Sequence, residues 1–398
     1  MAIITAPRIL LADELVAPGW VQLERSGIVA AGWGSPPDTP TTELRDGVLS
    51  PGLIDIQING AFGHDFAEAD ADAWAHVATR LPETGVTAFA PTIITAPVPK
   101  LADALARYHR LRPAVDTLGG ARTLGMHCEG PFLAAERRGA HREDLLCDPS
   151  PNHIDTLLDA AQGDLAYLTL APERTGALDA VRQLMAAEVG VALGHSDATD
   201  GQVRAAVDAG ASLITHLFNA QRPLHHREPG VVGAALAEPR LTAGLIADLH
   251  HVAPTAVRVA FAAAAGRLAL VTDAVAAMGM PAGSYELGGQ RVTVTEDSPP
   301  IREDGTLAGS VLRLDEAVGN CVRCGIDPAA ALTAATRVPA DALGRSDVGR
   351  LRPGARADLV WLDGQWRTAA TWVAGRLVHT DDRRTHAAVG LPASAGPG

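Results

Sequence analysis

The chain has 398 residues, of which 47% are hydrophobic and 20% are charged, and its formal net charge is −13. This acidity argues against nucleic acid and anionic membrane surfaces as partners, and no apolar run reaches the roughly 18 residues of a membrane span. Because the N-terminal segment also lacks a basic stretch before its apolar residues, we expect a cytoplasmic protein. Four cysteines in so long a chain do not make a disulfide framework.

Short apolar runs separated by turn signals predict β structure in residues 1–51. From residue 52 to residue 345, eight apolar runs alternate with helical patterns. These runs are Leu53–Ile58, Val86–Ala90, Leu124–His127, Leu165–Ala171, Val191–Leu193, Leu213–Leu217, Leu245–Asp248 and Leu268–Thr272. Runs that are apolar throughout suit a parallel sheet covered on both faces. The pattern therefore predicts an α/β fold, a (β/α)8 TIM-like barrel.

The chain after the eighth run changes character twice. Alternation around Gly288 and Gly289 predicts a hairpin, and helices are predicted over residues 310–324 and 328–336. β character returns at residues 346–380. Since neither β-rich end can bury a core alone, we expect both ends to form one small β-sandwich domain. Residues 381–398 are expected to be a flexible tail.

Several predicted strands end in an ionisable side chain. His195 and His216 follow consecutive strands, Glu129 follows the third strand, and Asp273 follows the eighth. In a barrel, such strand ends converge on the face where active sites are assembled. An isolated histidine is usually a satisfied core or surface residue, but two at matching strand ends favour a shared metal.

One carboxylate and two imidazoles, from Glu129, His195 and His216, are a typical set of ligands for catalytic zinc. Such a metal lowers the pKa of a water towards ~7. Asp273 is then the predicted proton carrier between water and leaving group. Its structural alternative is an Asx turn that opens the next loop.

The loop at residues 219–230 is basic within an acidic chain, because it carries Arg222, His225, His226 and Arg227. On the active-site face these cations predict an anionic group on the substrate, since guanidinium pairs with phosphate or carboxylate. The alternative is a solvated loop that balances nearby acids. His141, in the loop after the third strand, is placed to reach the same pocket.

At these residues the chain resembles the N-acetylglucosamine-6-phosphate deacetylases of the amidohydrolase superfamily. The resemblance extends from the first β segment to the end of the second β-rich region. Each motif is weak alone, but the ordered set is highly specific. The motifs are PGLIDIQING (51–60), GMHCEGPFL (125–133), LGHSDAT (193–199), THLFNA (215–220), REPG (227–230), VTDA (271–274), TLAGS (306–310) and PGARADLV (353–360).

The resemblance implies roles for the residues within these motifs. Glu129, His195 and His216 are similar to the metal ligands and Asp273 to the catalytic aspartate, while His141 is similar to the residue that binds and polarises the acetyl group. The residues expected to border the substrate are Gln57, Asn59, Ala140, His141, Asn219, Ala220, Arg227, His251, Leu307, Ala308 and Gly309.

Two positions depart from common patterns. Many amidohydrolases carry His-x-His on the first strand to hold a second metal, whereas this chain has Gln57-x-Asn59. Amides are poor zinc ligands, so we expect one divalent metal ion per chain, with Zn²⁺ first and Fe²⁺, Mn²⁺ and Co²⁺ as alternatives. Gln221 stands where many members have methionine, in the expected apolar wall of the pocket.

The predicted function is hydrolysis of N-acetylglucosamine 6-phosphate to glucosamine 6-phosphate and acetate. The resemblance also implies a homodimer in which Arg227 reaches the neighbouring site. Two alternatives stay open: the same chemistry on another N-acetyl amino sugar phosphate or a cyclic amide, and a catalytically silent barrel that serves as a binding protein. Retention of the three ligands and Asp273 argues against the silent barrel.

Overall fold

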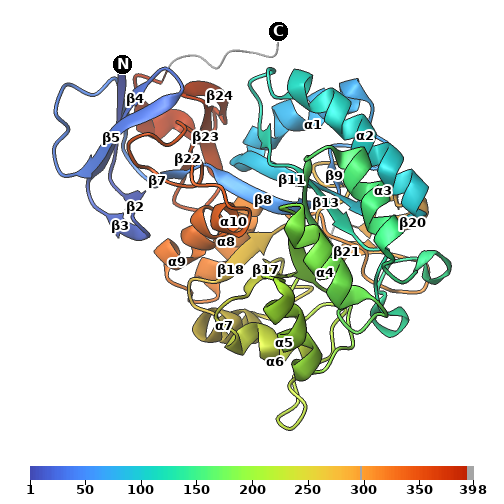
Figure 1. The fold of residues 1–398 in the computed structure, drawn as a ribbon. Helices are drawn as coiled ribbons and strands as arrows, with labels where there is room; N and C mark the ends of the chain where they lie inside the picture. Colours follow the sequence, from blue (N-terminus) through green and yellow to red (C-terminus); the bar gives the residue numbers. More distant parts are fainter. Residues whose placement is uncertain (296–297, 392–398) are drawn as a thin grey trace.

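The computed structural model describes residues 1–295 and 298–391. Its larger part is a ring of parallel strands surrounded by helices (Figure 1). The barrel strands are β8 (Leu53–Ile58), β11 (Val86–Ile94), β13 (Met126–Glu129), β14 (Leu165–Leu170), β15 (Gly190–Leu193), β16 (Leu213–Ile214), β17 (Thr242–Ile246) and β18 (Leu268–Val271). A parallel bridge between Ile58 and Ala274 joins the last strand to the first. The predicted α/β barrel is thereby confirmed.

The helices cover the outside of this ring with their apolar faces inward. In α1 the buried residues include Trp74 and Val77, and Asp70 caps the N-terminus by accepting a hydrogen bond from the Ala73 amide. No helix of the described residues is both long and apolar enough to cross a membrane. The helices are α1 (Ala71–Arg80), α2 (Val98–Val115), α3 (Pro151–Ala161), α4 (Ala177–Ala186), α5 (Asp200–Ala209), α6 (Gly230–Ala237), α7 (Pro254–Ala263), α8 (Leu314–Arg323), α9 (Pro328–Ala334) and α10 (Arg337–Ala342).

A small β-sandwich built from both chain ends lies beside the barrel (Figure 1). One sheet contains β1 (Ala2–Ala6), β4 (Gly19–Glu24), β5 (Gly27–Trp33), β6 (Thr42–Leu44) and β25 (Ala388–Val389). The other contains β2 (Ile9–Leu11), β3 (Glu14–Val16), β7 (Val48–Pro51), β22 (Leu359–Leu362), β23 (Thr368–Val373) and β24 (Arg376–Thr380). Their shared core includes Ile9, Val21, Trp361 and Trp372. The predicted sandwich of the two ends is therefore confirmed.

Gly52 is the joint between sandwich and barrel. Strand β7 ends at Pro51 and β8 begins at Leu53, so the chain passes from one sheet to the other across a single residue. A Cβ atom at Gly52 would lie 2.1 Å from the Thr87 hydroxyl oxygen. Any other residue here would therefore force Thr87 or the backbone at this joint to shift.

The hairpin predicted around Gly288 and Gly289 is confirmed. Strand β19 (Gly283–Leu287) pairs antiparallel with β20 (Gln290–Thr295), and β21 (Ser298–Ile301) adds a third strand. Both glycines have positive φ angles, 53° and 74°, as a tight hairpin turn requires. The hairpin packs an apolar face over the barrel mouth, where its Leu287 meets Ile94.

Two segments near the C-terminus differ from the elements predicted for them. The helix expected over residues 310–324 begins only at Leu314, because Ser310 instead forms a parallel bridge to Ala274. In the segment 381–398, Ala388–Val389 pairs with β6. Residues 392–398 lie outside the described residues.

Asp55 is a fully buried carboxylate in the wall of the barrel. Its oxygens accept hydrogen bonds from the backbone amides of Gln57 and Thr272, each at 3.2 Å, and from the Thr272 hydroxyl. Burial raises the pKa of Asp55 to about 7, because the cost of desolvation exceeds the gain from these bonds.

This raised pKa predicts a pH-dependent stability. The folded chain binds more protons than the unfolded chain between about pH 4 and pH 7, so the stabilisation is full at low pH and is lost as pH rises. The free energy of unfolding of the wild type, minus that of Asp55→Asn, should fall by up to ~1.4 kcal/mol per pH unit across this window. Denaturant titrations of both proteins measure this difference, and a constant difference would contradict the assignment.

Candidate active site

Four strand ends bring Glu129, His195, His216 and Asp273 to one point at the barrel mouth. Glu129 is the last residue of β13, and the other three each follow a strand by two residues. All four side chains are buried, with Glu129 only 2% and Asp273 only 8% exposed. Charged and polar groups are rarely buried to this extent unless they are paired or bind a ligand.

Three of these residues have a backbone conformation that is rare outside glycine. The φ angles are 47° at His195, 25° at His216 and 50° at Asp273. A left-handed conformation costs on the order of 1–3 kcal/mol and is concentrated at functional sites. The chain therefore leaves the extended conformation in the same way after β15, β16 and β18, at the residue whose side chain enters the barrel mouth.

Glu129, His195 and His216 converge on one point through single atoms. The Oε1 atom of Glu129 lies 3.0 Å from Nε2 of His195 and 2.9 Å from Nε2 of His216, and the two nitrogens are 3.1 Å apart. Ligands of a tetrahedral zinc ion with bonds of about 2.1 Å are about 3.4 Å from one another. The three atoms thus need to separate only slightly to hold a single divalent cation.

His195 is held in the tautomer that a metal ligand requires. Its Nδ1 atom lies 2.9 Å from the backbone carbonyl of Arg137, which can only accept a hydrogen bond. The ring proton is therefore on Nδ1, and the lone pair of Nε2 is free to bind a metal.

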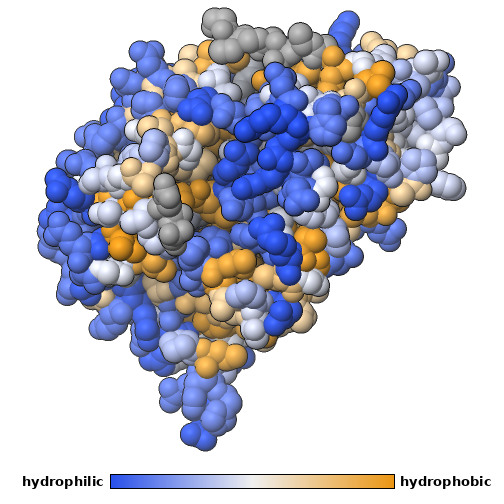
Figure 2. Space-filling view, turned by 180° about the vertical axis from the view of Figure 1, so that it is seen from behind, coloured by the Kyte–Doolittle hydropathy of each residue, from blue (hydrophilic) through white to orange (hydrophobic). Residues whose placement is uncertain are grey.

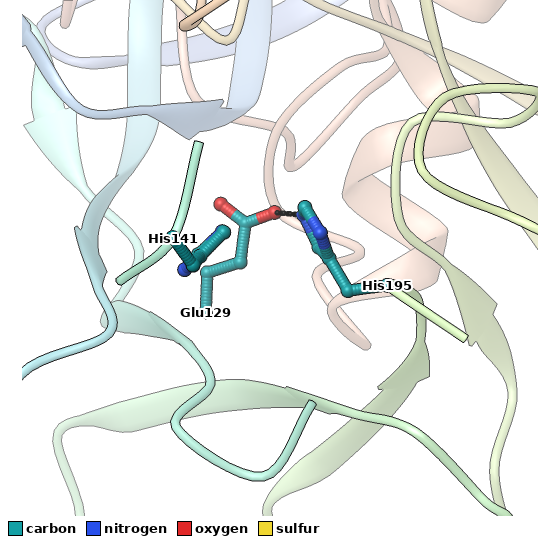
Figure 3. A group of neighbouring side chains, drawn as sticks. All are labelled: Glu129, His141 and His195. Atoms are coloured by element: carbon teal, nitrogen blue, oxygen red, sulfur yellow. Dashed lines mark hydrogen bonds and ion pairs between the residues drawn. The ribbon is translucent and has the colours of Figure 1, made fainter. Parts of the chain in front are cut away.

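His141 approaches the same two residues from a loop. Glu129, His141 and His195 each offer one ligand atom, and these atoms lie within 4.8 Å of one another. Figure 3 shows the carboxylate of Glu129 between the two imidazole rings. His141 Nδ1 lies 2.8 Å from the Thr95 hydroxyl. The structure thus contains two overlapping sets of three candidate metal ligands. Both sets include Glu129 and His195, and the third ligand is either His216 or His141.

The amides at the position of a second metal serve as hydrogen-bond donors. Asn59 Nδ2 donates to Asp273 Oδ1 at 2.7 Å, and Gln57 Nε2 lies 3.3 Å from the same atom and 3.4 Å from Glu129 Oε2. Both amides therefore hold the two carboxylates in place. Their N–H groups supply the positive ends of dipoles beside these carboxylates.

The two carboxylates differ in their readiness to bind a proton. Burial raises the pKa of Glu129, but hydrogen bonds and charge from His195 and His216 outweigh it and hold the pKa well below the usual range. Burial and the nearby charge of Glu129 raise the pKa of Asp273 to about 6. Glu129 is therefore a permanent anion suited to a cation, whereas Asp273 can exchange a proton near neutral pH.

The sequence profile of the amidohydrolase family matches residues 48–378, most of the chain. The chain belongs to the amidohydrolase family. The N-acetylglucosamine-6-phosphate deacetylase of Vibrio furnissii is 40% identical over 332 residues, which cover 83% of this chain and 82% of that protein. The N-acetylgalactosamine-6-phosphate deacetylase of Escherichia coli O157:H7 is 38% identical over 377 residues, which cover 93% of this chain and 97% of that protein.

A solved structure agrees with these relatives. A mutant N-acetyl-D-glucosamine-6-phosphate deacetylase from Mycobacterium smegmatis, in complex with N-acetyl-D-glucosamine-6-phosphate, superposes with a TM-score of 0.90 at 37% identity. The match covers 95% of this chain and 99% of that one. The resemblance inferred from the motifs is confirmed, and the chain is an enzyme of amide hydrolysis.

The site of this amidohydrolase opens into a cavity of about 380 Å³, the size of a small-ligand pocket. Most of the residues expected to border the substrate line it, together with Glu129, His195, His216 and Asp273. These expected residues are Asn59, Ala140, His141, Asn219, Ala220, His251, Leu307 and Gly309. His251 is itself fixed, because its Nδ1 lies 2.7 Å from Asp248 Oδ2.

Three expected residues do not line the cavity. Gln57 lies beneath it, and Ala308 packs in the apolar cluster below the hairpin. Arg227 belongs to the segment between β16 and α6, which projects from the body of the protein (Figure 1) and has a hydrophilic tip (Figure 2). Its guanidinium lies 3.0 Å from His226 Nε2 and makes no salt bridge within the described residues.

Gln221 does not belong to the pocket wall. Its side chain donates to the Thr215 carbonyl at 2.7 Å and accepts from the Phe218 amide at 3.1 Å. An amide here closes the loop after β16 by hydrogen bonds that methionine could not make. The apolar wall comes instead from Ile94, Ile246 and Leu287.

Several lining residues were not predicted from the sequence. Arg137 comes from the loop after β13 and Leu287 from the end of β19, and no local pattern reveals how either segment packs over the barrel mouth. Ile94, which lines the cavity, and Thr95, which follows it, were missed because Pro91 favours ending the run at Ala90, whereas β11 continues through Pro91 to Ile94. The two threonines after Pro91 were the available signal that the strand continues.

Proposed function

We propose that this amidohydrolase removes the acetyl group of N-acetylglucosamine 6-phosphate, which yields glucosamine 6-phosphate and acetate. The observation that carries this proposal is the buried convergence of Glu129, His195 and His216, with Asp273 beside them, at the base of a ligand-sized cavity. A silent binding protein would gain nothing from a strained and buried set of charges.

We propose Glu129, His195 and His216 as the ligands of one divalent ion. His216 is preferred to His141 because its Nε2 atom lies within 3.1 Å of both other ligand atoms. Two imidazoles and one carboxylate favour zinc, and the amides Gln57 and Asn59 leave no second set of good ligands. The ion would lower the pKa of the attacking water and polarise the acetyl carbonyl.

The remaining chemistry is assigned to side chains of the chain itself. Asp273, held by the 2.7 Å hydrogen bond from Asn59, takes a proton from the attacking water and passes it to the departing amine. His141 donates a hydrogen bond to the acetyl oxygen. Asn219, Ala220 and His251 are proposed to contact the sugar phosphate.

The experiment that tests this function is acetate release from a panel of N-acetyl amino sugars, with and without a 6-phosphate. N-acetylglucosamine 6-phosphate should be hydrolysed best, and the unphosphorylated sugar should be much poorer. No acetate from any member of the panel, with metal bound, would refute the proposal.

A second candidate substrate is N-acetylgalactosamine 6-phosphate. The relative named for it aligns over 377 residues, a longer stretch than the 332 residues of the Vibrio furnissii relative. The chemistry at the metal would be the same, since the two sugars differ in the configuration of one hydroxyl group. Including both epimers in the panel distinguishes them by kcat/KM.

Arg227 is proposed to bind the substrate phosphate across a homodimer. Arg137 is the only lysine or arginine that lines the cavity in the described residues, and it is paired with Asp197 at 2.8 Å. Arg222 pairs with the same carboxylate at 2.7 Å. Both guanidinium groups therefore already have a carboxylate partner, whereas Arg227 is carried outward on the projecting loop, where it can enter the site of a second copy.

Arg227→Ala is expected to weaken transition-state binding of the phosphorylated substrate by about 2–4 kcal/mol, the loss typical of a removed charge partner. The unphosphorylated sugar should change much less, and Arg204→Ala, at an exposed pair on α5, serves as the control. Mixed dimers of Arg227→Ala and Asp273→Asn subunits should recover activity if the arginine acts across the interface. Equal losses on both sugars would make Arg227 structural.

A further inference from the structure

The hydroxyl group of Thr95 lies between two possible hydrogen-bond acceptors, one on His141 and one on Glu129. Thr95 follows β11 directly and is only 4% exposed. Its hydroxyl oxygen lies 2.8 Å from His141 Nδ1 and 3.3 Å from the backbone carbonyl of Glu129. The single hydroxyl proton can be donated to one of these acceptors at a time.

The group that accepts the hydrogen bond from the Thr95 hydroxyl determines the tautomer of His141. A neutral imidazole carries its single proton on either Nδ1 or Nε2. If Thr95 donates to the Glu129 carbonyl, the ring proton must be on Nδ1, and Nε2 then has the lone pair of a metal ligand. If Thr95 donates to Nδ1, the proton is on Nε2, which becomes a donor toward the cavity.

We infer that Thr95 donates to His141 Nδ1 and thereby keeps the ring proton on Nε2, as a positioning residue for the reaction. The 3.3 Å contact with the Glu129 carbonyl is longer than the roughly 2.5–3.0 Å of an O–H···O hydrogen bond, whereas the 2.8 Å contact with Nδ1 suits a hydroxyl donor. Donation by Thr95 therefore decides which histidine completes the metal site with Glu129 and His195. His216 remains the ligand, and His141 becomes a hydrogen-bond donor.

The chemistry of the cavity supports the same assignment. An unprotonated Nε2 would direct a lone pair into a cavity that already holds the Glu129 carboxylate, and the acetyl oxygen would add another acceptor. A proton on Nε2 gives that oxygen a donor. The naming of the acetyl oxygen as recipient rests on the proposed function, but the position of the proton does not.

Nitrogen NMR of protein labelled at histidine tests the tautomer without any substrate. In the zinc-loaded wild type, the His141 signal, identified by its loss in His141→Asn, should show the proton on Nε2. In Thr95→Val, which keeps the shape of the side chain and removes the hydroxyl, this preference should be lost. A wild-type ring protonated on Nδ1 would overturn the inference.

Kinetics and metal analysis on the same proteins give the second readout. Thr95→Val should retain its metal and its KM while kcat falls roughly 10- to 100-fold, the usual effect of removing an orienting hydrogen bond. Thr95→Ser should restore kcat, and Thr336→Val, which removes a buried hydroxyl on the helices outside the barrel, should change nothing. An unchanged kcat in Thr95→Val would refute the inference.

The two proposals fail in different ways. If the wild type releases no acetate from any sugar, the proposed function is wrong, but the NMR tautomer still decides the role of Thr95. If Thr95→Val does not fold, the wild-type tautomer and the kcat of Thr95→Ser decide it.

Discussion

Replacing His195 or His216 with alanine is expected to remove the metal and the activity together. Each histidine supplies one of three converging atoms, at 3.0 and 2.9 Å from Glu129 Oε1, and two ligands hold a divalent ion poorly. The metal is worth several kcal/mol of transition-state stabilisation, so turnover should fall at least ~1,000-fold. Elemental analysis of protein purified without added metal should give one equivalent for the wild type and almost none for either variant.

Two further histidines sharpen this result. His386→Ala, at an exposed position near the C-terminus, should retain both metal and activity, and His141→Ala should lose activity but retain metal. If His216→Ala remains loaded while His141→Ala is empty, the ligand set is Glu129, His141 and His195 instead. Two equivalents of metal in a fully active wild type would contradict the single-metal site.

Asp273→Asn is expected to separate binding from catalysis. The amide can still accept the hydrogen bond from Asn59, so the variant should keep its metal and bind substrate. It cannot take a proton, and turnover should therefore fall at least ~100-fold, the scale of lost general acid–base catalysis. Turnover, metal content and substrate affinity measured on one preparation check this expectation, with Asp208→Asn, in the exposed pair with Arg240, as the control.

The pH dependence of the wild type belongs to the same prediction. Burial and the charge of Glu129 raise the pKa of Asp273 to about 6, and a bound cation would lower it. Because the base must be ionised, turnover of the metal-loaded enzyme should be lost as the solution becomes acidic, with a midpoint below pH ~6. Near-normal turnover in Asp273→Asn would exclude Asp273 as the base and direct attention to His141 or His251, and loss of metal would make Asp273 a ligand.

The barrel could be predicted from the sequence because its strands are covered on both faces and are therefore apolar throughout. The site could be located because its residues directly follow those runs. Strand ends were predicted less well, since they depend on backbone conformation. The run at Leu213–Leu217 forms a strand only at Leu213–Ile214, where the chain turns toward the left-handed φ of His216.

Contacts between distant segments account for what the sequence could not reveal. Arg222 and Arg227 occupy one basic loop, and the sequence alone does not distinguish them. In the structure Arg222 is paired with Asp197, whereas Arg227 is exposed. Gln57 and Asn59 were expected near the substrate, and Asn59 does line the cavity, but the sequence did not reveal that the two amides hold Asp273 and Glu129. Each outcome depends on which carboxylate the barrel brings close, and no spacing along the chain encodes this.

The sandwich shared by both chain ends has a consequence for synthesis on the ribosome. Strand β7 pairs with β22, and about 300 residues separate them in the chain. At roughly 5–20 residues per second, the first strands wait on the order of 15–60 s for their partners. During that interval the edge of β7 is open to pairing with other nascent chains. Chaperone dependence should therefore be greatest for chains arrested just before residue 359.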